Sequence, residues 1–273
     1  MVPFWAIAVL IGASATAVLL MLAVRRYLAP EGLLRDSVPA TGVFGVLGVA
    51  FAVLLAFVLF LAFEGYNRAH AGASREAVAV TQLLREAKLL PQPQQNELRG
   101  GLVCYARSVV SNEWPSMPTT GESALVSEWV ATIESTVDRI PVDGARTEVA
   151  LSHWLDEMTE RREGRRARLS EAESSLPSTV WLMLGLGSAL TVLYLLLLAD
   201  RRERWWVQGA MIGTITALVV SSLLVVNFLD HPFNEDGAYI PPDEMTTTLR
   251  LIEDEISADA TFPVPCDDQG RPV

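Results

Sequence analysis

Residues 41–63 read TGVFGVLGVAFAVLLAFVLFLAF, a run of 23 residues without a charged side chain. An α-helix of about 20 residues crosses the roughly 30 Å of hydrocarbon in a bilayer. A lone apolar segment in lipid must satisfy its backbone N–H and C=O groups internally, and a helix does so. The stretch therefore predicts a membrane-spanning helix.

Three further windows have the same character, at residues 2–24, 178–199 and 205–229. The whole chain of 273 residues is 51% apolar and only 19% charged, which is typical of a membrane protein rather than of a soluble domain. The predicted fold class is all-α, with four transmembrane helices in two hairpins.

The first window could instead be a cleaved signal peptide, because Ala13-Ser14-Ala15 offers small residues for cleavage. No Lys or Arg precedes the window, however, whereas Arg25 and Arg26 follow it, the reverse of a secretory signal. We therefore interpret it as an anchor.

The windows divide the chain into four parts. These are a transmembrane hairpin at 1–63, a water-exposed helical domain at 64–177, a second hairpin at 178–229 and an acidic, Pro-containing tail at 230–273. The domain should be a helical bundle, with one helix continuing the second span to residue 90. Periodic apolar residues predict further helices within 98–115, 125–137 and 147–176.

Arginines in the short loops predict the orientation. Cytoplasmic loops are enriched in Lys and Arg, so the loops after the first and third spans should face the cytoplasm. The soluble domain and both termini would then be extracytoplasmic. The arginines between residues 161 and 168 lie near the third span on the opposite side and argue against this. The loop arginines are Arg25, Arg26, Arg35, Arg201, Arg202 and Arg204.

The two cysteines, Cys104 and Cys266, are separated by an even number of spans and so lie on the same side of the membrane. In an oxidising compartment they could form a disulfide. The alternative is two unrelated thiols, one in a helix and one in a loose tail, and it is the default because sequence does not reveal their distance.

Small residues recur at four-residue spacing in the second and fourth spans. Such stripes allow close helix packing, within one chain or between copies. They comprise Gly48, Ala52 and Ala56 in the second span, and Gly209, Gly213, Ala217 and Ser221 in the fourth.

A different face of the second span carries Phe57, Leu61, Glu64 and Arg68. It could form an apolar constriction that opens into a charged mouth. The simpler alternative is that Phe57 and Leu61 face lipid, while Glu64 and Arg68 form a solvated pair.

Two polar features lie near the ends of the helices. Asn227, Asp230 and His231 either cap the end of the fourth span or line a wet vestibule. The arginines between 161 and 168 alternate with glutamates, which favours a salt-bridged helix surface over an anion-attracting one. Metal-ligand spacings, phosphate loops and nucleophile motifs are missing, so we expect no enzyme, no cofactor and no metal.

Four segments carry a resemblance to a known family. These are residues 45–57 (GVLGVAFAVLLAF), 63–66 (FEGY), 105–110 (YARSVV) with 113–115 (EWP), and 229–233 (LDHPF). In this order they resemble the bacterial multi-pass membrane proteins of the bestrophin-like domain family, whose function is unknown. The resemblance covers about residues 20 to 255.

The resemblance implies similarity to bestrophins, which are pentameric anion channels whose second span lines an apolar neck. Phe57 and Leu61 would form that neck here, whereas the acidic calcium-binding cluster of the animal channels is not recognised. Bestrophins keep the corresponding soluble domain in the cytoplasm, in conflict with the orientation that the loop arginines predict.

Two functions from different classes follow. One is a homo-oligomeric ion channel in a bacterial cytoplasmic membrane, whose partners are lipid, further copies of the chain, in a pentamer if it follows bestrophins, and small inorganic ions. The other is a non-conducting sensor or scaffold whose soluble domain binds a partner. No binding of nucleic acid is expected.

Overall fold

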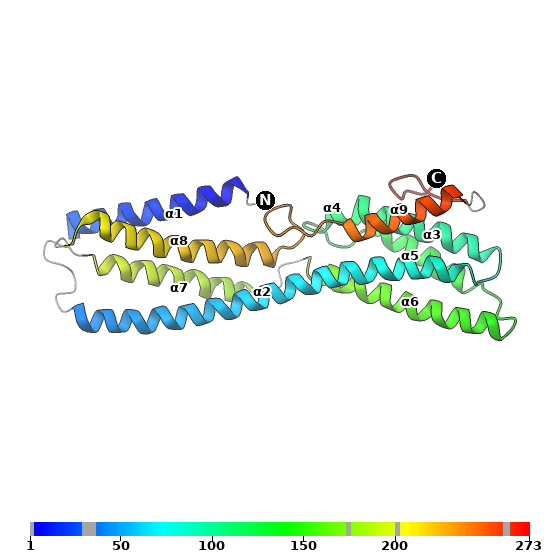
Figure 1. The fold of residues 1–273 in the computed structure, drawn as a ribbon, viewed down its shortest axis with the longest axis horizontal. Helices are drawn as coiled ribbons and strands as arrows, with labels where there is room; N and C mark the ends of the chain where they lie inside the picture. The colour runs from blue at the N-terminus through cyan, green and yellow to red at the C-terminus, as the bar shows by residue number, and fades with distance from the viewer. Residues whose placement is uncertain (1–2, 29–36, 173–175, 200–202, 259–262) are drawn as a thin grey trace. The chain divides into compact units, whose positions relative to one another are not determined.

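The computed structural model describes residues 3–28, 37–172, 176–199, 203–258 and 263–273 (Figure 1). Within these ranges the chain is helical and contains no strand, which confirms the all-α class. The chain divides into two compact units. The membrane unit comprises residues 1–65, 174–230 and 235–238, and the soluble unit comprises residues 66–173, 231–234 and 239–273.

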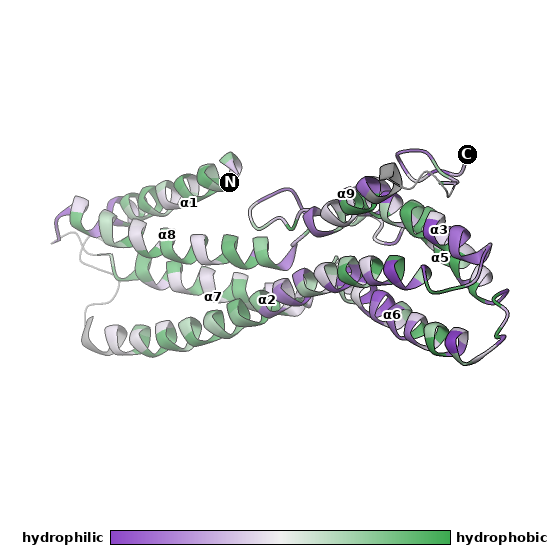
Figure 2. Cartoon of the chain, turned by 45° about the vertical axis from the view of Figure 1, so that its right-hand side comes forward, coloured by the Kyte–Doolittle hydropathy of each residue, from purple (hydrophilic) through white to green (hydrophobic). Residues whose placement is uncertain are grey.

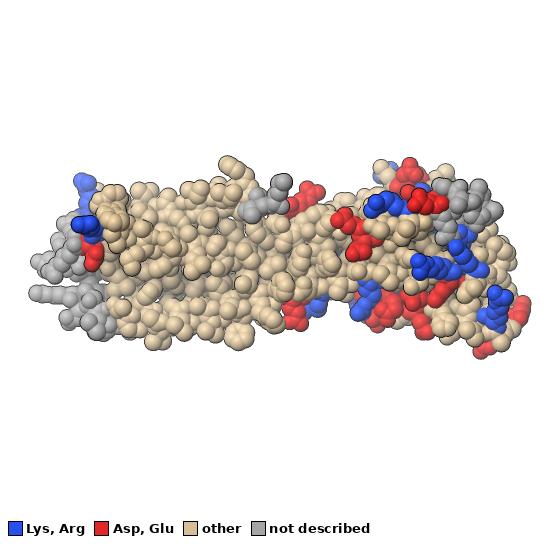
Figure 3. All heavy atoms as spheres, in the orientation of Figure 1, with Lys and Arg blue, Asp and Glu red and all other residues tan. Residues whose placement is uncertain are grey.

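Among the described residues, four helices are long and apolar enough to cross a membrane, as predicted. They are α1 (Phe4–Ala23), α2 (Ser37–Ala87), α7 (Ser178–Leu197) and α8 (Trp205–Asp230). Apolar residues dominate α1, α7, α8 and the first half of α2 (Figure 2). On the face shown in Figure 3, the surface over these segments carries charged residues only near its ends.

Two contacts organise the membrane unit. Helix α1 packs along α8, where Met21 and Val18 approach Gly209. Helix α2 meets α7, where the ring of Phe51 lies against Gly187 so closely that a Cβ atom there would collide with it. Leu184, Val219 and Val226 are buried in the same cluster as Phe51, and Met21 belongs to a second cluster with Ile212. The predicted spans therefore pack as one helical unit.

Helix α2 is 51 residues long and continues from the membrane unit into the soluble unit. About 20 residues suffice to cross a bilayer. The segment from Glu64 to Ala87 therefore continues the helix beyond the predicted span by roughly 36 Å, at 1.5 Å per residue. The predicted continuation of the second span is present and ends three residues before the expected end at residue 90. Its buried alanines and leucines form part of the core of the soluble unit.

The soluble unit is a helical bundle around a buried core that includes Trp154, Leu98 and Leu102. Its other helices are α3 (Gln94–Ser108), the π-helix η2 (Val109–Glu113), α4 (Trp114–Ser116), α5 (Ala124–Val137), α6 (Ala145–Ser170) and α9 (Asp243–Ala258). No helix was predicted in the tail, yet α9 packs on α3 and buries Met245 and Ile252.

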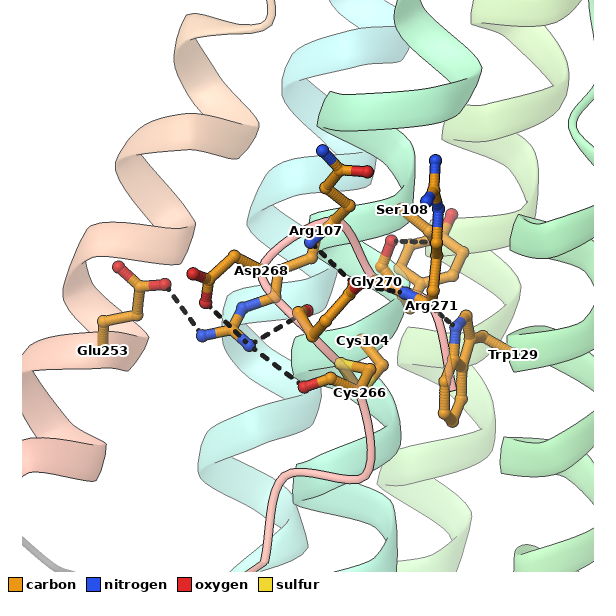
Figure 4. The surroundings of a disulfide bond; sticks show 12 residues. Cys104, Arg107, Ser108, Trp129, Glu253, Cys266, Asp268, Gly270 and Arg271 are labelled. Atoms are coloured by element: carbon orange, nitrogen blue, oxygen red, sulfur yellow. Dashed lines mark hydrogen bonds and ion pairs between the residues drawn. A yellow bond between two sulfur atoms is a disulfide. The ribbon is translucent and has the colours of Figure 1, made fainter. Parts of the chain in front are cut away.

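Residues 263–273 form a second ordered part of the tail, which packs on α3 and α5 (Figure 4). Cys266 is disulfide-bonded to Cys104 of α3, 162 residues earlier, with the Cα atoms 5.8 Å apart. The indole of Trp129 donates a buried hydrogen bond of 2.7 Å to the carbonyl of Gly270. Gly270 has a φ of +77° and lies against the backbone of Ser108, so no side chain fits there. The structure has the bonded alternative, so the default interpretation of two unrelated thiols is wrong.

Candidate functional site

The face proposed as a pore lining is exposed in the single chain. Phe57 and Leu61 are 66% and 53% exposed, and Glu64 is exposed as well. The opposite side of α2 is packed, because Phe51 and Val58 are buried and Leu55 and Leu59 join the same core. Arg68 belongs to the soluble unit, where its Nε donates to Glu171 at 2.9 Å. The first three residues thus present an uncovered face.

The two small-residue stripes have different surroundings. In α8, Gly209 and Gly213 lie against Val18 of α1, and Ala217 borders the same contact, whereas the Ser221 hydroxyl bonds to the Leu218 carbonyl. In α2, nothing approaches Gly48 within 4 Å of its Cβ position. Gly48, Ala52 and Ala56 border an apolar groove of about 350 Å³ between α2, α7 and α8. One stripe is packed within the chain, and the other leaves space.

The polar residues at the end of α8 are only partly exposed. Asp230 is buried and accepts hydrogen bonds from the Leu176 backbone N–H at 2.9 Å and from the Trp181 indole at 3.2 Å. It therefore holds the start of α7. Asn227 and His231 are half-buried at the same turn of the chain.

The loop arginines that the structure describes lie at the other end of the membrane unit. Arg25 of the π-helix η1 (Val24–Leu28) donates to the Gln208 side chain at 2.6 Å and to the Glu203 carbonyl at 2.8 Å. These hydrogen bonds join the end of the first span to the start of the fourth. Arg35, Arg201 and Arg202 lie outside the described residues.

The most elaborate polar arrangement is a buried ion network inside the soluble unit. Its centre is Arg168 of α6, which is fully buried. Arg168 donates from Nε to Glu76 of α2 at 2.7 Å and from Nη2 to Glu113 of η2 at 2.7 Å. Its guanidinium also lies 4.7 Å from the ring centre of Trp114. Burying charges is costly unless they are paired, and here each carboxylate meets this guanidinium.

Two further arginines of α6 extend the network. Arg165 contacts both carboxylate oxygens of Glu113, and Arg161 donates to the Tyr105 hydroxyl at 3.2 Å. The Tyr105 hydroxyl in turn donates to Glu76. Burial and the nearby Glu76 carboxylate raise the pKa of Tyr105 far above its usual range, so the phenol stays neutral. Arg165 and Arg168 therefore pair with the two buried glutamates, and Arg161 joins the network through Tyr105.

Burial acts to raise the pKa of Glu113, but the hydrogen bonds and positive charges of Arg165 and Arg168 outweigh it. The pKa of Glu113 consequently lies below its ordinary value. The backbone N–H of Ser123 also donates to this carboxylate, at 3.1 Å. Glu113 is thus held ionised at the centre of several helices.

The π-helix η2 explains how Glu113 comes to point inward. A proline cannot donate a backbone hydrogen bond, so Pro115 removes the N–H that would otherwise continue the α-helical ladder. The backbone widens into a π-helix just before it, and π-helices are often found at functional sites. The Trp114 indole then donates to the Ile240 carbonyl at 3.0 Å and stacks edge-on against Phe233. Trp114 and Phe233 therefore lie in one core of the soluble unit.

The interpretation of the arginine run as a salt-bridged helix surface is wrong for Arg161 and Arg168, which are 2% and 0% exposed. Their partners come from other helices because α6 turns this face toward α2 and α3. Sequence reasoning also missed Glu76 and Glu113 as members of a site. The sequence did contain an indication for Glu76. It is a charged residue on a helix face whose other members, such as Gly72, Ala73 and Val80, are small or apolar.

Comparisons with known proteins agree with this fold. A family model described as a bestrophin-like domain matches residues 11–239. A crystal structure of a bacterial bestrophin homolog from Klebsiella pneumoniae, phased with zinc, superposes with a TM-score of 0.69 at 15% identity, covering 90% of this chain and 98% of that one. A variant of the same homolog superposes with a TM-score of 0.72 at 16% identity, covering 92% of this chain and 98% of the variant.

Another crystal structure, described as that of a membrane protein, superposes with a TM-score of 0.71 at 16% identity, covering 93% of this chain and 99% of the other. No curated protein matches the sequence closely enough to count as a relative. At such low identity the structural likeness shows the fold alone, but the family model covers most of the chain. This protein therefore belongs to the bestrophin-like family.

Proposed function

We propose that this chain assembles into a homo-oligomeric ion channel that passes anions, with α2 lining the pore. The observation that carries the proposal is the uncovered face of α2. Phe57 and Leu61 are exposed on a helix whose opposite side is packed against its own chain. A pore needs several copies, because the described spans have no continuous polar face within one chain. Membership of a family named for bestrophins supports a channel.

The proposed neck is apolar and its mouth is charged. Large apolar side chains can close a pore by expelling water, and Phe57 with Leu61 supplies such a ring when copies surround an axis. Glu64 follows one turn later on the same face of α2. A negative charge there disfavours anions, so Glu64 would set their rate of entry rather than attract them.

We further propose that the soluble unit lies outside the cytoplasm. Disulfides persist in oxidising compartments, and the bond between Cys104 and Cys266 supports that location. The arginines Arg25 and Arg204 lie at the connections between spans, which the positive-inside rule assigns to the cytoplasm. This orientation is opposite to that of bestrophins.

Chloride efflux from liposomes containing the purified protein tests the channel. We expect wild-type efflux above that of empty liposomes, faster efflux for Phe57→Ala because the neck widens, and faster efflux for Glu64→Gln because a negative charge is removed. Phe63→Ala is the matched control, since Phe63 is 50% exposed on the same helix but about 120° around it. Equal leak from wild type, Phe57→Ala and Glu64→Gln would remove the support for a channel.

One observation favours the second candidate, a non-conducting sensor. Helix α2 is continuous from the membrane unit to Glu76 in the buried ion network, so a change at the network could be transmitted along one helix. Mass measurement in detergent separates the two candidates. A monomer that retains its fold would exclude the channel and favour the sensor, whereas a defined oligomer is what the channel requires.

A further inference from the structure

A pocket of about 510 Å³ opens beside α6 in the soluble unit. Four arginines line it, on the turns of α6 that pass over the buried ion network. The single acidic residue of its lining is Glu122, in the segment before α5. The arginines are Arg161, Arg162, Arg165 and Arg166. The volume is in the range of small-ligand sites.

The charges around this pocket do not cancel. Arg165 is paired with Glu113 and lies 3.4 Å from Glu122, and Arg162 is paired with Glu134 at 3.1 Å. Against four guanidinium groups there are thus three carboxylates, which leaves one excess positive charge. Below the pocket, Arg168 and Glu76 balance each other. The chain as a whole has a net charge of −11, so this positive concentration stands out.

Two of the arginines have unused donors. Arg161 is only 2% exposed, and its Nε has no hydrogen-bond acceptor in the described part of the chain. Buried donors are rarely left unsatisfied, so an acceptor is expected there. Arg166 is exposed, and its guanidinium has no partner among the residues that the structure describes. A guanidinium offers five N–H donors in a planar fork that matches two oxygens of one anion.

We infer that this pocket binds an oxyanion of the phosphate type, held by Arg161, Arg162, Arg165 and Arg166. Phosphate fits better than chloride because its several oxygens can accept from neighbouring guanidinium groups at once. Glu122 competes for Arg165 and therefore limits the affinity. The inference concerns the soluble unit alone and does not depend on ion conduction.

The first experiment titrates inorganic phosphate into the purified, delipidated full-length protein in a non-ionic detergent, followed by calorimetry. Sodium chloride at matched ionic strength is the comparison. We expect saturable binding of phosphate, about tenfold weaker binding for Arg166→Ala, and tighter binding for Glu122→Gln. Arg166→Ala removes an exposed side chain, so the fold should persist.

Two matched controls lie elsewhere on α6. Arg146→Ala and Glu148→Gln change exposed residues near the start of the helix and should leave phosphate binding unchanged. If Arg146→Ala weakened phosphate binding as much as Arg166→Ala does, or if phosphate and chloride gave equal heats, the effect would be general charge screening. Either result would overturn the proposed site.

The phosphate group could be free or part of a lipid headgroup. Native mass spectrometry of protein reconstituted with phosphatidylglycerol and then stripped of bulk lipid distinguishes these sources. Retention of phosphatidylglycerol in wild type and its loss in Arg166→Ala identify the lipid, whereas calorimetric binding without lipid retention identifies the free ion. If neither phosphate nor phosphatidylglycerol binds, the proposal is wrong.

Discussion

Gly72 of α2 and Gly164 of α6 meet so closely that a Cβ atom added to Gly164 would lie 2.9 Å from the Gly72 carbonyl oxygen and 2.6 Å from the Glu76 nitrogen. A Cβ atom at Gly72 would collide equally with the backbone at Arg168. This close crossing brings Glu76 and Arg168 together, because each lies one turn beyond its glycine. The buried ion network thus depends on two residues that carry no side chain.

Gly164→Ala should therefore destabilise the soluble unit. Forcing a methyl group between two packed backbones typically costs about 1–3 kcal/mol. Thermal unfolding followed by tryptophan fluorescence would report it, since Trp154 lies in the same core. Gly185→Ala is the control, because nothing lies within 4 Å of that position in α7. A Gly164→Ala protein as stable as wild type would show that the two helices can move apart freely.

The lowered pKa of Glu113 makes stability depend on pH in a defined direction. Its folded-state pKa is below the ordinary value of about 4.3, so the unfolded chain binds the proton first. The contribution of ionised Glu113 to the free energy of unfolding is complete above pH ~4.3 and is lost as the pH falls through its folded-state pKa. We expect the free energy of unfolding to fall over this acidic range.

Glu113→Gln should remove that part of the pH dependence and lower stability at neutral pH, because Arg165 and Arg168 lose a charged partner. Breaking one side of a buried ion pair costs about 3–5 kcal/mol. Unfolding curves measured from pH 7 to pH 3 for wild type, Glu113→Gln and the exposed Glu148→Gln provide the comparison. Parallel curves for wild type and Glu113→Gln would contradict the assignment.

The disulfide should contribute measurably to stability. Closing a long loop restricts the unfolded chain, and removing a native disulfide typically costs about 2–5 kcal/mol. Cys266→Ser should lower the unfolding temperature, and Cys104→Ser should do so equally. The double variant should lose no more than either single one, because the same bond is absent in all three. Reductant should destabilise wild type but not the variants.

Thiol counting checks the bond itself. Wild-type protein denatured without reductant should react with no maleimide, since the bond joins its two cysteines. Two reactive thiols in protein taken from membranes would show that Cys104 and Cys266 are reduced there, and the proposed orientation would lose its support.

The membrane helices could be predicted because lipid imposes one rule on every uncharged stretch. The windows at 178–199 and 205–229 coincide with α7 and α8 to within two residues. Helices of the soluble bundle followed from apolar spacing and prolines. The same spacing in Met245, Thr248 and Ile252 could have revealed α9, which was overlooked among the acidic residues of the tail.

The buried network could not be predicted in the same way. Arg168 lies in a run of charges that suits a solvated surface, and only the packing of α6 against α2 turns it inward. Its partners Glu76 and Glu113 are 92 and 55 residues away in the chain. Ion pairs between residues so far apart in the sequence depend on which helices pack together. The local sequence pattern of one helix does not reveal its packing partners.

The cross-link between Cys104 and Cys266 has a consequence for biogenesis. One of its thiols is synthesised before the third span and the other after the fourth. Were either span to fail to insert, the two thiols would emerge in different compartments and could never meet. Under this topology the disulfide would be missing from any chain in which one of these two spans alone fails to insert, so its presence would distinguish such chains from correctly inserted ones.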